Sequence, residues 1–262
     1  TSIENIHKVI DPLFLDELKA EFEEIRNIAV KRTRERKLQD FQKKLSTLTF
    51  LDPACGSGNF LTETYLSLRR LENEILQELQ GGEMVLGYDN MNPIQVSISQ
   101  FYGIEINDFA VTVAKTALWI AESQMMKETE SIVLMHLDFL PLKTNAFIHE
   151  GNALQVDWES VIPKYQLSYI MGNPPFVARA GRTKAKDSSS KGMLDDTQKT
   201  DRLNVFGEDL GNVDYVACWF KKAAVFTKNT AIRCAFVATD SICQGQQIYP
   251  IWKNILQDDI YI

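Results

Sequence analysis

The residues that most clearly suggest a binding or catalytic site follow the strand-like run 167–171. They are a glycine and then Asn173, Pro174, Pro175 and Phe176. Two consecutive prolines fix φ, remove two backbone donors and disfavour helix, so they hold the asparagine on a stiff, extended corner. The amide oxygen of Asn173 and a neighbouring carbonyl that no local N–H can claim make two acceptors beside an apolar ring. Such a pocket suits a planar ring that bears an exposed NH₂ group. Because Asn-Pro is a common turn dipeptide, an ordinary loop after a strand is the alternative.

A glycine loop stands between an apolar run, 48–51, and a helical pattern of apolar residues. The loop, 52–60, reads Asp-Pro-Ala-Cys-Gly-Ser-Gly-Asn-Phe. Gly56 and Gly58 allow a tight turn and close approach to a ligand, and the following helix N-terminus offers free N–H groups and positive potential. A dinucleotide fingerprint would have a third glycine at position 61, where this chain has Leu61. The loop therefore fits a nucleoside-type ligand better than a pyrophosphate.

The run 101–107 predicts a second parallel strand with Glu105 near its end. A carboxylate at that position can accept hydrogen bonds from both ribose hydroxyls, although a solvated strand end is the simpler interpretation. Glu105 lies further from Asp52 than the roughly 20 residues of a compact mononucleotide unit, which we attribute to an insertion over 81–100. Asp108 is then expected to cap a helix whose apolar face comprises Phe109, Val113, Ala117 and Ile120.

Three more strands are expected, at 146–149, 167–171 and 234–238, and the first of them leads to Asn152 and Ala153. Open α/β sheets bind ligands at the carboxyl ends of their strands, where the strand order reverses. The stiff corner after 167–171 should therefore face the glycine loop. Further helices are expected after Asp214 and after Gly245.

Two basic stretches admit two interpretations each. The first, 31–37, belongs to a helical N-terminal segment, 1–47, whose first helix should open at Asp11 and Pro12. It could contact DNA phosphates, but its carboxylate and amphipathic surroundings favour a solvated helix face. The second lies in a polar insertion, 178–212, which is either a mobile lid that meets phosphates or a plain flexible insertion.

Composition describes an ordinary globular chain of 262 residues, with 45% hydrophobic and 24% charged residues. Its formal charge of −7 argues against a nucleic-acid surface over the whole chain, but not against one basic groove. No signal pattern appears and no apolar run reaches the ~18 residues of a membrane span, so we expect a cytoplasmic protein. The four cysteines lack metal-ligand spacing, so we expect reduced, mostly buried thiols and no metal site. The start at Thr1 and the end within an apolar run, 260–262, suggest a piece of a longer protein.

Together, the loop 52–60 and the corner 172–176 resemble the motifs of amino-methyl DNA methyltransferases that modify adenine at N6. The flanking runs 9–15, 101–106, 212–219 and 241–245 are similar to one branch, the MmeI-like single-chain restriction–modification enzymes. The resemblance covers nearly the whole chain. It implies a class I methyltransferase fold, with a Rossmann-like, mainly parallel seven-stranded α/β sheet over 48–262 whose last strands lie beyond this chain.

The resemblance also implies S-adenosyl-L-methionine as the cofactor and double-stranded DNA as the substrate. Its target-base residues are Asn173, Pro174, Pro175 and Phe176. The family usually has Asp where this chain has Asn152, near the cofactor adenine; an amide can still hydrogen-bond an exocyclic amine. The implied cofactor-binding set is Asp52, Ala54, Cys55, Gly56, Gly58, Asn59, Phe60, Glu105, Ile106, Asn152, Ala153 and Asn173.

The family places a target-recognition domain downstream of the methyltransferase core, and often a nuclease domain upstream. Two other functions stay open at this point. The same acceptors would suit the side-chain amide of a protein glutamine, whose NH₂ group is also planar. The chain could also be a non-catalytic module that binds cofactor or DNA.

Overall fold

The computed structural model describes residues 1–80, 93–134, 137, 145–177, 194–207 and 213–256. Most of the expected polar insertion 178–212, most of the insertion 81–100 and the apolar run 260–262 lie outside these residues. Within 194–207, part of the expected polar insertion forms a helix.

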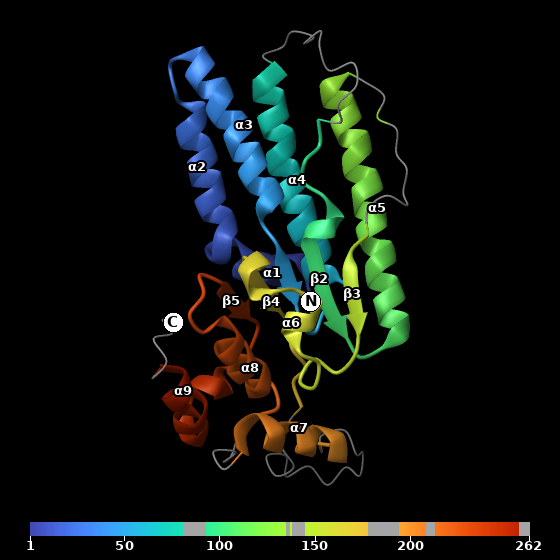
Figure 1. Ribbon diagram of the computed structural model, residues 1–262, viewed down its shortest axis with the longest axis vertical. Coiled ribbons are helices and arrows are strands. Elements are labelled where there is room, and N and C mark those ends of the chain that lie inside the picture. Colours follow the sequence, from blue (N-terminus) through green and yellow to red (C-terminus); the bar gives the residue numbers. More distant parts are fainter. Residues whose placement is uncertain (81–92, 135–136, 138–144, 178–193, 208–212, 257–262) are drawn as a thin grey trace.

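A parallel sheet with the strand order β3-β2-β1-β4-β5 forms the centre of the described chain (Figure 1). Its strands are β1 (Phe50–Asp52), β2 (Phe101–Glu105), β3 (Phe147–Glu150), β4 (Tyr169–Gly172) and β5 (Arg233–Phe236). Each overlaps a strand predicted from the sequence. The described residues form the five strands predicted within this chain, and the seven-stranded sheet of the complete fold is not seen in them. The strand order reverses between β1 and β4, and this switch point lies between the glycine loop and the Asn-Pro-Pro corner.

Helices cover both faces of the sheet. The α-helices are α1 (Ile3–Ile10), α2 (Asp16–Arg26), α3 (Lys31–Thr47), α4 (Asn59–Gln80), α5 (Asp108–Val133), α6 (Trp158–Val161), α7 (Asp196–Phe206), α8 (Ala217–Thr227) and α9 (Ile248–Leu256). Shorter turns are η1 (Asp11–Leu15), η2 (Ile98–Gln100), η3 (Lys164–Gln166), η5 (Asp240–Cys243) and η6 (Gly245–Gln247). Figure 1 shows α2 to α5 extending side by side beyond the sheet, with α7, α8 and α9 at the opposite end.

An aromatic row crosses the face of the sheet that the N-terminal helices cover. The strand register places Phe50 of β1 beside Phe101 of β2 and Tyr169 of β4. Their rings stack with centroids 5.2 and 5.4 Å apart, and Phe14 packs onto the row. The N-terminal helices thus share one hydrophobic core with the sheet and with α4. Leu51, on the other face, belongs to a second core with α8 and α9.

The first helix begins earlier than the sequence predicted. Ser2 caps α1 through its hydroxyl, which accepts from the Asn5 N–H, so the prediction that Asp11 and Pro12 open the helix was wrong. Residues Asp11–Leu15 instead form a wider π turn that runs directly into α2, with the Asp16 N–H donating to the Asp11 carbonyl. Proline has no N–H and crowds the preceding turn, and a local widening of the helix accommodates both effects.

The predicted apolar face of α5 was also wrong. Phe109 and Ile120 are 74% and 54% exposed, and the buried stripe contains Val111, Ala114 and Leu118 instead. The helix is apolar around much of its circumference, so its periodicity does not select one face. This buried stripe packs closely on the glycine loop, because a Cβ added at Gly58 would lie 3.0 Å from the Cβ of Ala114.

Two predicted helix caps were also displaced. Asn107, rather than the next residue, caps α5 by accepting from the Ala110 N–H at 3.0 Å. The carboxylate of Asp214 does not cap α8, which begins at Ala217, but accepts from Ser241 Oγ at 2.7 Å. Asp214 therefore joins the start of α8 to the turn before α9.

Candidate functional site

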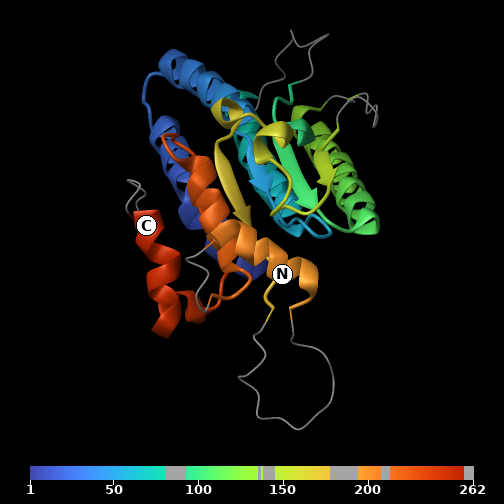
Figure 2. The same ribbon diagram turned by 60° about the horizontal axis from the view of Figure 1, so that its bottom comes forward.

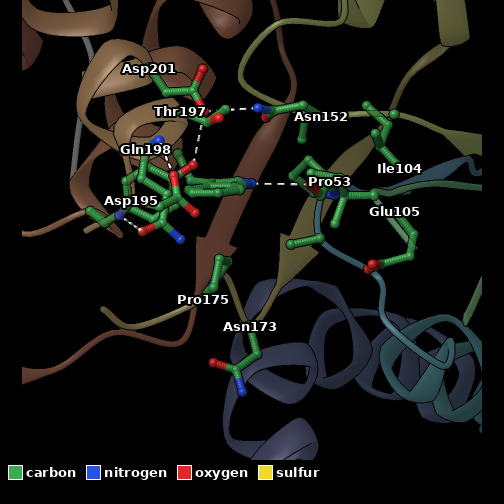
Figure 3. A pocket seen from close by; sticks show the side chains of 16 residues that line it. Pro53, Ile104, Glu105, Asn152, Asn173, Pro175, Asp195, Thr197, Gln198 and Asp201 are labelled. Atoms are coloured by element: carbon green, nitrogen blue, oxygen red, sulfur yellow. Dashed lines mark hydrogen bonds between the residues drawn. The ribbon is translucent and has the colours of Figure 1, made fainter. Parts of the chain in front are cut away.

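A cavity of about 450 Å³ opens at the carboxyl edge of the sheet (Figure 3). Its wall includes residues from the ends of β1, β2, β3 and β4, together with α7 and the start of α8. The lining residues are Pro53, Ala54, Ile104, Glu105, Ile106, Gly151, Asn152, Ala153, Asn173, Pro175, Asp195, Thr197, Gln198, Asp201, Tyr215 and Trp219. The structure therefore gathers residues from both sequence motifs around one cavity, at the position where parallel α/β sheets bind ligands.

The glycine loop turns sharply from β1 into α4. Gly56 and Gly58 have φ of +55° and +81°, which residues with a Cβ rarely adopt. The Cys55 N–H donates to the Ile104 carbonyl at 3.1 Å, and this bond fixes the loop against β2. Cys55 and Phe60 are buried, so in this structure their side chains support the loop from behind.

Only part of the expected cofactor set lines the cavity. Of the loop residues in this set, Ala54 is the one that forms part of the cavity wall. Asp52, Cys55 and Phe60 are buried beside or behind the cavity, while Asn59 is exposed at the first turn of α4. The other expected residues that line the cavity are Glu105, Ile106, Asn152, Ala153 and Asn173.

Glu105 holds its carboxylate against two backbone donors. Its Oε2 accepts from the Gly56 N–H at 2.8 Å, and its Oε1 accepts from the Asn107 N–H at 3.0 Å. These bonds orient the side chain at the end of β2, where it forms part of the cavity wall. Each oxygen retains capacity for a further donor such as a hydroxyl.

Asp52 is a buried carboxyl group beneath the site, with 1% of its surface exposed. Its Oδ1 accepts from the Ala54 N–H at 3.0 Å. Burial raises its pKa to about 7, the Ala54 hydrogen bond opposes this shift, and the nearby charge of Glu105 adds to it. A carboxyl that holds a proton near neutral pH therefore lies directly under the glycine loop.

This pKa predicts a specific dependence of stability on pH. Between about pH 4 and pH 7 the folded protein keeps a proton on Asp52 that the unfolded chain has released. The free energy of unfolding should therefore fall as the pH rises through this window, by at most about 1.4 kcal/mol per pH unit. Asp52→Asn keeps the acceptor for the Ala54 N–H but cannot titrate, so its urea-unfolding free energy should fall less steeply between about pH 5 and pH 7. Equal slopes for the two proteins would contradict the prediction.

Gly172 allows the end of β4 to lie against Asp52. A Cβ added at Gly172 would lie 2.3 Å from Asp52 Oδ1 and 2.9 Å from Asp52 Cγ. The carboxyl group is enclosed and hydrogen-bonded, so it has little room to move away. The glycine that precedes Asn173 is thus required by packing at the base of the site.

We expect Gly172→Ala to destabilise the protein by about 1–3 kcal/mol, the usual effect of overpacking a filled site. The same change should displace Asn173, so the activity that the methyltransferase resemblance implies should fall more than the affinity for the implied cofactor. Urea unfolding and initial-rate measurements would test both expectations. In an Asp52→Ala background the Cβ at position 172 has space, so Gly172→Ala should cause little further loss of stability. A loss as large as in the wild-type background would exclude the proposed clash.

Asn173 leaves β4 on the corner predicted by the two prolines. Its Nδ2 donates to Thr1 Oγ1 at 2.8 Å, and its Oδ1 is buried without a hydrogen-bond partner among the described residues. Pro174 is buried, Pro175 contributes to the cavity wall and Phe176 is 44% exposed. An unpaired buried acceptor costs about 1–3 kcal/mol, so the site retains an oxygen suited to an incoming N–H donor.

Sequence reasoning missed the α7 side of the cavity. Asp195, Thr197, Gln198 and Asp201 lie in or next to the first turns of α7, within the stretch interpreted as a polar insertion. A local signal was present, because Asp195 and Gln198 form a capping box that marks a helix start. Nothing local indicated that this helix returns to the end of β3.

Tyr215 and Trp219 also line the cavity and were not predicted as site residues. Trp219 is only 4% exposed. Its Nε1 donates to the Pro53 carbonyl at 3.1 Å, so it also joins α8 to the glycine loop.

The basic stretch 31–37 lies away from the cavity, in the first turns of α3. Its residues Lys31, Arg32, Arg36 and Lys37 are exposed, and Lys31 lies 3.8 Å from Glu35. This arrangement fits a solvated helix face.

Two of the four cysteines, Cys55 and Cys218, are buried free thiols. Cys234 and Cys243 are exposed free thiols, so the expectation of mostly buried thiols holds for only half of them. Among the described residues no cluster of His, Cys, Asp and Glu could hold a metal ion. None of the helices in the described ranges combines the length and the apolar character needed to cross a bilayer.

Comparison with curated proteins gives related methyltransferases. The chain is 38% identical over 267 residues to DNA methyltransferase A of Bacillus subtilis (strain 168), a match that spans 100% of this chain and 28% of that protein. It is also 34% identical over 74 residues to the adenine-specific methyltransferase PglX of Streptomyces coelicolor, which spans 28% of this chain and 5% of that protein.

A solved structure agrees with the fold. The type IIL restriction-modification enzyme MmeI, determined in complex with DNA, superposes with a TM-score of 0.85 and 43% sequence identity. The match covers 98% of this chain and 32% of that chain. This chain therefore spans less than a third of the length of the methyltransferases named above and about a third of the MmeI chain. Residues 28–262 match the DNA-methyltransferase domain of MmeI, and the chain belongs to that family of methyltransferase domains.

Proposed function

We propose that this domain transfers a methyl group from S-adenosyl-L-methionine to the N6 amine of adenine in double-stranded DNA, as part of a restriction–modification enzyme. The observation that supports it most directly is the position of Asn173 and Pro175 in the wall of the same cavity as Glu105 and Asn152. A cofactor held by the ends of β2 and β3 would thus lie next to the acceptor corner at the end of β4.

The cavity residues fit this cofactor by their chemistry. The volume of about 450 Å³ is within the range of small-molecule sites. Glu105 can accept ribose hydroxyls, and Ile104, Pro53 and Trp219 provide apolar surface for a base. The positive-φ glycine loop leaves space at Gly56, where an added Cβ would meet nothing within 4 Å. We assign the amino-acid end of the cofactor to this loop.

When bound, S-adenosyl-L-methionine supplies a methyl group on a positively charged sulfur. The chain's own task is to prepare the adenine amine, whose lone pair is delocalised into the ring and is a poor nucleophile. Asn173 Oδ1 and the Pro174 carbonyl would accept its two N–H hydrogens and favour a more tetrahedral nitrogen. Pro174 offers a rigid acceptor, because the adjacent proline rings restrict the backbone.

Phe176 would stack on the target base after it leaves the duplex. A base paired inside DNA cannot reach a cavity at the sheet edge, so the base must be flipped. The ring of Phe176 is partly exposed beside the corner, which fits a role as a stacking surface. Catalysis then depends on positioning and electrostatics, and no covalent enzyme intermediate is required.

The native protein is proposed to contain more than this domain. The choice of DNA sequence would then lie in a downstream target-recognition domain, and DNA cleavage in an upstream nuclease domain. Both proposals come from the resemblance to single-chain restriction–modification enzymes.

The function is tested with the full-length protein, methyl-labelled S-adenosyl-L-methionine and a pool of random-sequence duplexes. We expect label in DNA, and N6-methyladenine after digestion to nucleosides. Matched duplexes in which N6-methyladenine replaces adenine should take up no label. Label in a protein glutamine, with unlabelled DNA, would show that the substrate is a protein amide and not DNA. Failure to bind the cofactor in calorimetry would indicate a non-catalytic module.

A further inference from the structure

We infer that Asp201 of α7 recognises the exocyclic amine of the cofactor adenine, an assignment that rests on the function proposed above. Asp201 lines the cavity and is only 1% exposed, although carboxylates are rarely buried so fully. It lies on a helix that follows the target-base corner in the chain. In sequence, this helix is far from the position after β3 where the family usually has an acidic residue. Here that position is occupied by Asn152.

Three neutral donors hold the Asp201 carboxylate in place. Its Oδ2 accepts from Asn152 Nδ2 at 2.8 Å and from Tyr215 OH at 3.0 Å, and its Oδ1 accepts from Gln155 Nε2 at 2.9 Å. Each carboxylate oxygen can accept about two hydrogen bonds. Oδ2 is therefore saturated, whereas Oδ1 has capacity for one more donor.

Asn152 is itself committed to the protein. Its Oδ1 accepts from the Leu154 N–H at 2.9 Å, and its Nδ2 faces Asp201. The amide therefore presents a donor to the carboxylate instead of an acceptor to the ligand. Asn152 acts as a positioning residue for Asp201, and the acceptor missing from position 152 is supplied by α7.

The arrangement within the cavity places the adenine at this end. Figure 3 shows Asp201 and Asn152 together on one side, Glu105 on an adjoining wall, and Asn173 and Pro175 on the side away from Asp201. With the ribose at Glu105, the base extends to Asp201 and the reactive end of the cofactor extends to Asn173. An ionised carboxylate only accepts hydrogen bonds, so it favours an amine at this ring position over a carbonyl.

The test measures the affinity of the full-length protein for two ligands by calorimetry: S-adenosylhomocysteine and its inosine counterpart, in which a carbonyl replaces the amine. We expect the wild type to bind the amine form at least about a hundred-fold more tightly, because the carbonyl would face a buried carboxylate. In Asp201→Asn the amide can donate to the carbonyl, and the ratio should fall below about ten-fold. If that variant does not fold, Asp201→Ser permits the same comparison, since a hydroxyl both donates and accepts.

Asp196→Asn is the matched control, because Asp196 is an exposed carboxylate on the same helix that does not line the cavity. Its ratio should equal that of the wild type. If Asp201 only supported α7, its replacement would lower both affinities together and leave their ratio unchanged. An unchanged ratio in the Asp201 variants therefore overturns the assignment. A wild type that binds both ligands equally overturns it as well. If the wild type binds neither ligand, the proposed cofactor itself is wrong, and the two failures are therefore distinguishable.

Discussion

Replacing Asn173 with alanine is expected to reduce methyl transfer to DNA by at least about a hundred-fold while leaving cofactor affinity within about two-fold of the wild type. The change removes Oδ1, the buried oxygen for which the described chain provides no donor. Losing one preorganised hydrogen-bonding group at a reacting centre typically lowers the rate by about 10²–10³-fold. Single-turnover rates with saturating cofactor and calorimetry with S-adenosylhomocysteine measure the two quantities separately.

The side chain of Asn173 points away from the part of the cavity formed by Asn152 and Asp201 (Figure 3). Its truncation therefore removes an acceptor without opening the proposed adenine end of the cofactor site. The contact from Nδ2 to Thr1 Oγ1 is also lost, but that bond is exposed and should contribute little to stability. The unfolding midpoint of the variant should stay close to that of the wild type.

Asn173→Asp distinguishes the role of the amide oxygen, Oδ1, from that of the amide nitrogen, Nδ2. Aspartate retains an oxygen in place of Oδ1, so it should preserve more activity than alanine if the acceptor is the essential group. If Asn173 acts mainly as a donor through Nδ2, aspartate should be as inactive as alanine. An alanine variant within about ten-fold of the wild-type rate would remove Asn173 from the proposed chemistry.

The sheet and the position of its ligand edge could be predicted because both depend on short-range features. Strands β1, β2 and β4 are brief apolar runs, and β1 and β4 lead into loops whose glycine or proline residues are visible in the sequence. The family motifs then follow from residues adjacent in the chain. Figure 2 shows the same elements from below, with α7 crossing near the ends of the strands.

Features that depend on distant contacts could not be predicted. The buried face of α5 depends on how closely Ala114 approaches Gly58, and an apolar helix contains no periodic signal for that choice. Asp201 reaches the cavity only because α7 folds back onto the end of β3. A short polar helix in a basic, glycine-rich stretch offers no local sign of such a return.

Helix α4 provides the clearest example of a feature that local sequence does not show, because three of its charged residues, Glu63, Arg69 and Glu72, are buried. Arg69 and Glu72 are each 0% exposed and form an ion pair with one another. Their spacing of three residues is that of an ordinary surface pair, and the sequence does not show that α3 and α5 pack on both sides of α4. Arg69 Nη2 donates to Thr129 Oγ1 of α5 at 2.7 Å, so the pair also joins two long helices.

Glu72 is the centre of this network. Its Oε1 accepts from Gln42 Nε2 of α3 at 2.8 Å and from the backbone N–H groups of Gln95 and Val96 at 2.7 and 3.2 Å. One carboxylate thus connects α3, α4 and the segment that leads into β2. Two of the residues whose donors it satisfies, Gln42 and Val96, are buried.

Glu72→Ala should therefore lower the free energy of unfolding by about 3–5 kcal/mol, because it leaves the Arg69 guanidinium buried without its counter-charge. Glu74→Ala is the matched control: Glu74 lies on the same helix but is exposed, and its removal should change stability by less than about 0.5 kcal/mol. The double change Arg69→Met with Glu72→Met removes both charges and should be much less destabilising than Glu72→Ala. Urea unfolding of the variants measures these differences, and equal stabilities for Glu72→Ala and Glu74→Ala would show that the buried pair contributes nothing to the packing of α4 between its neighbours.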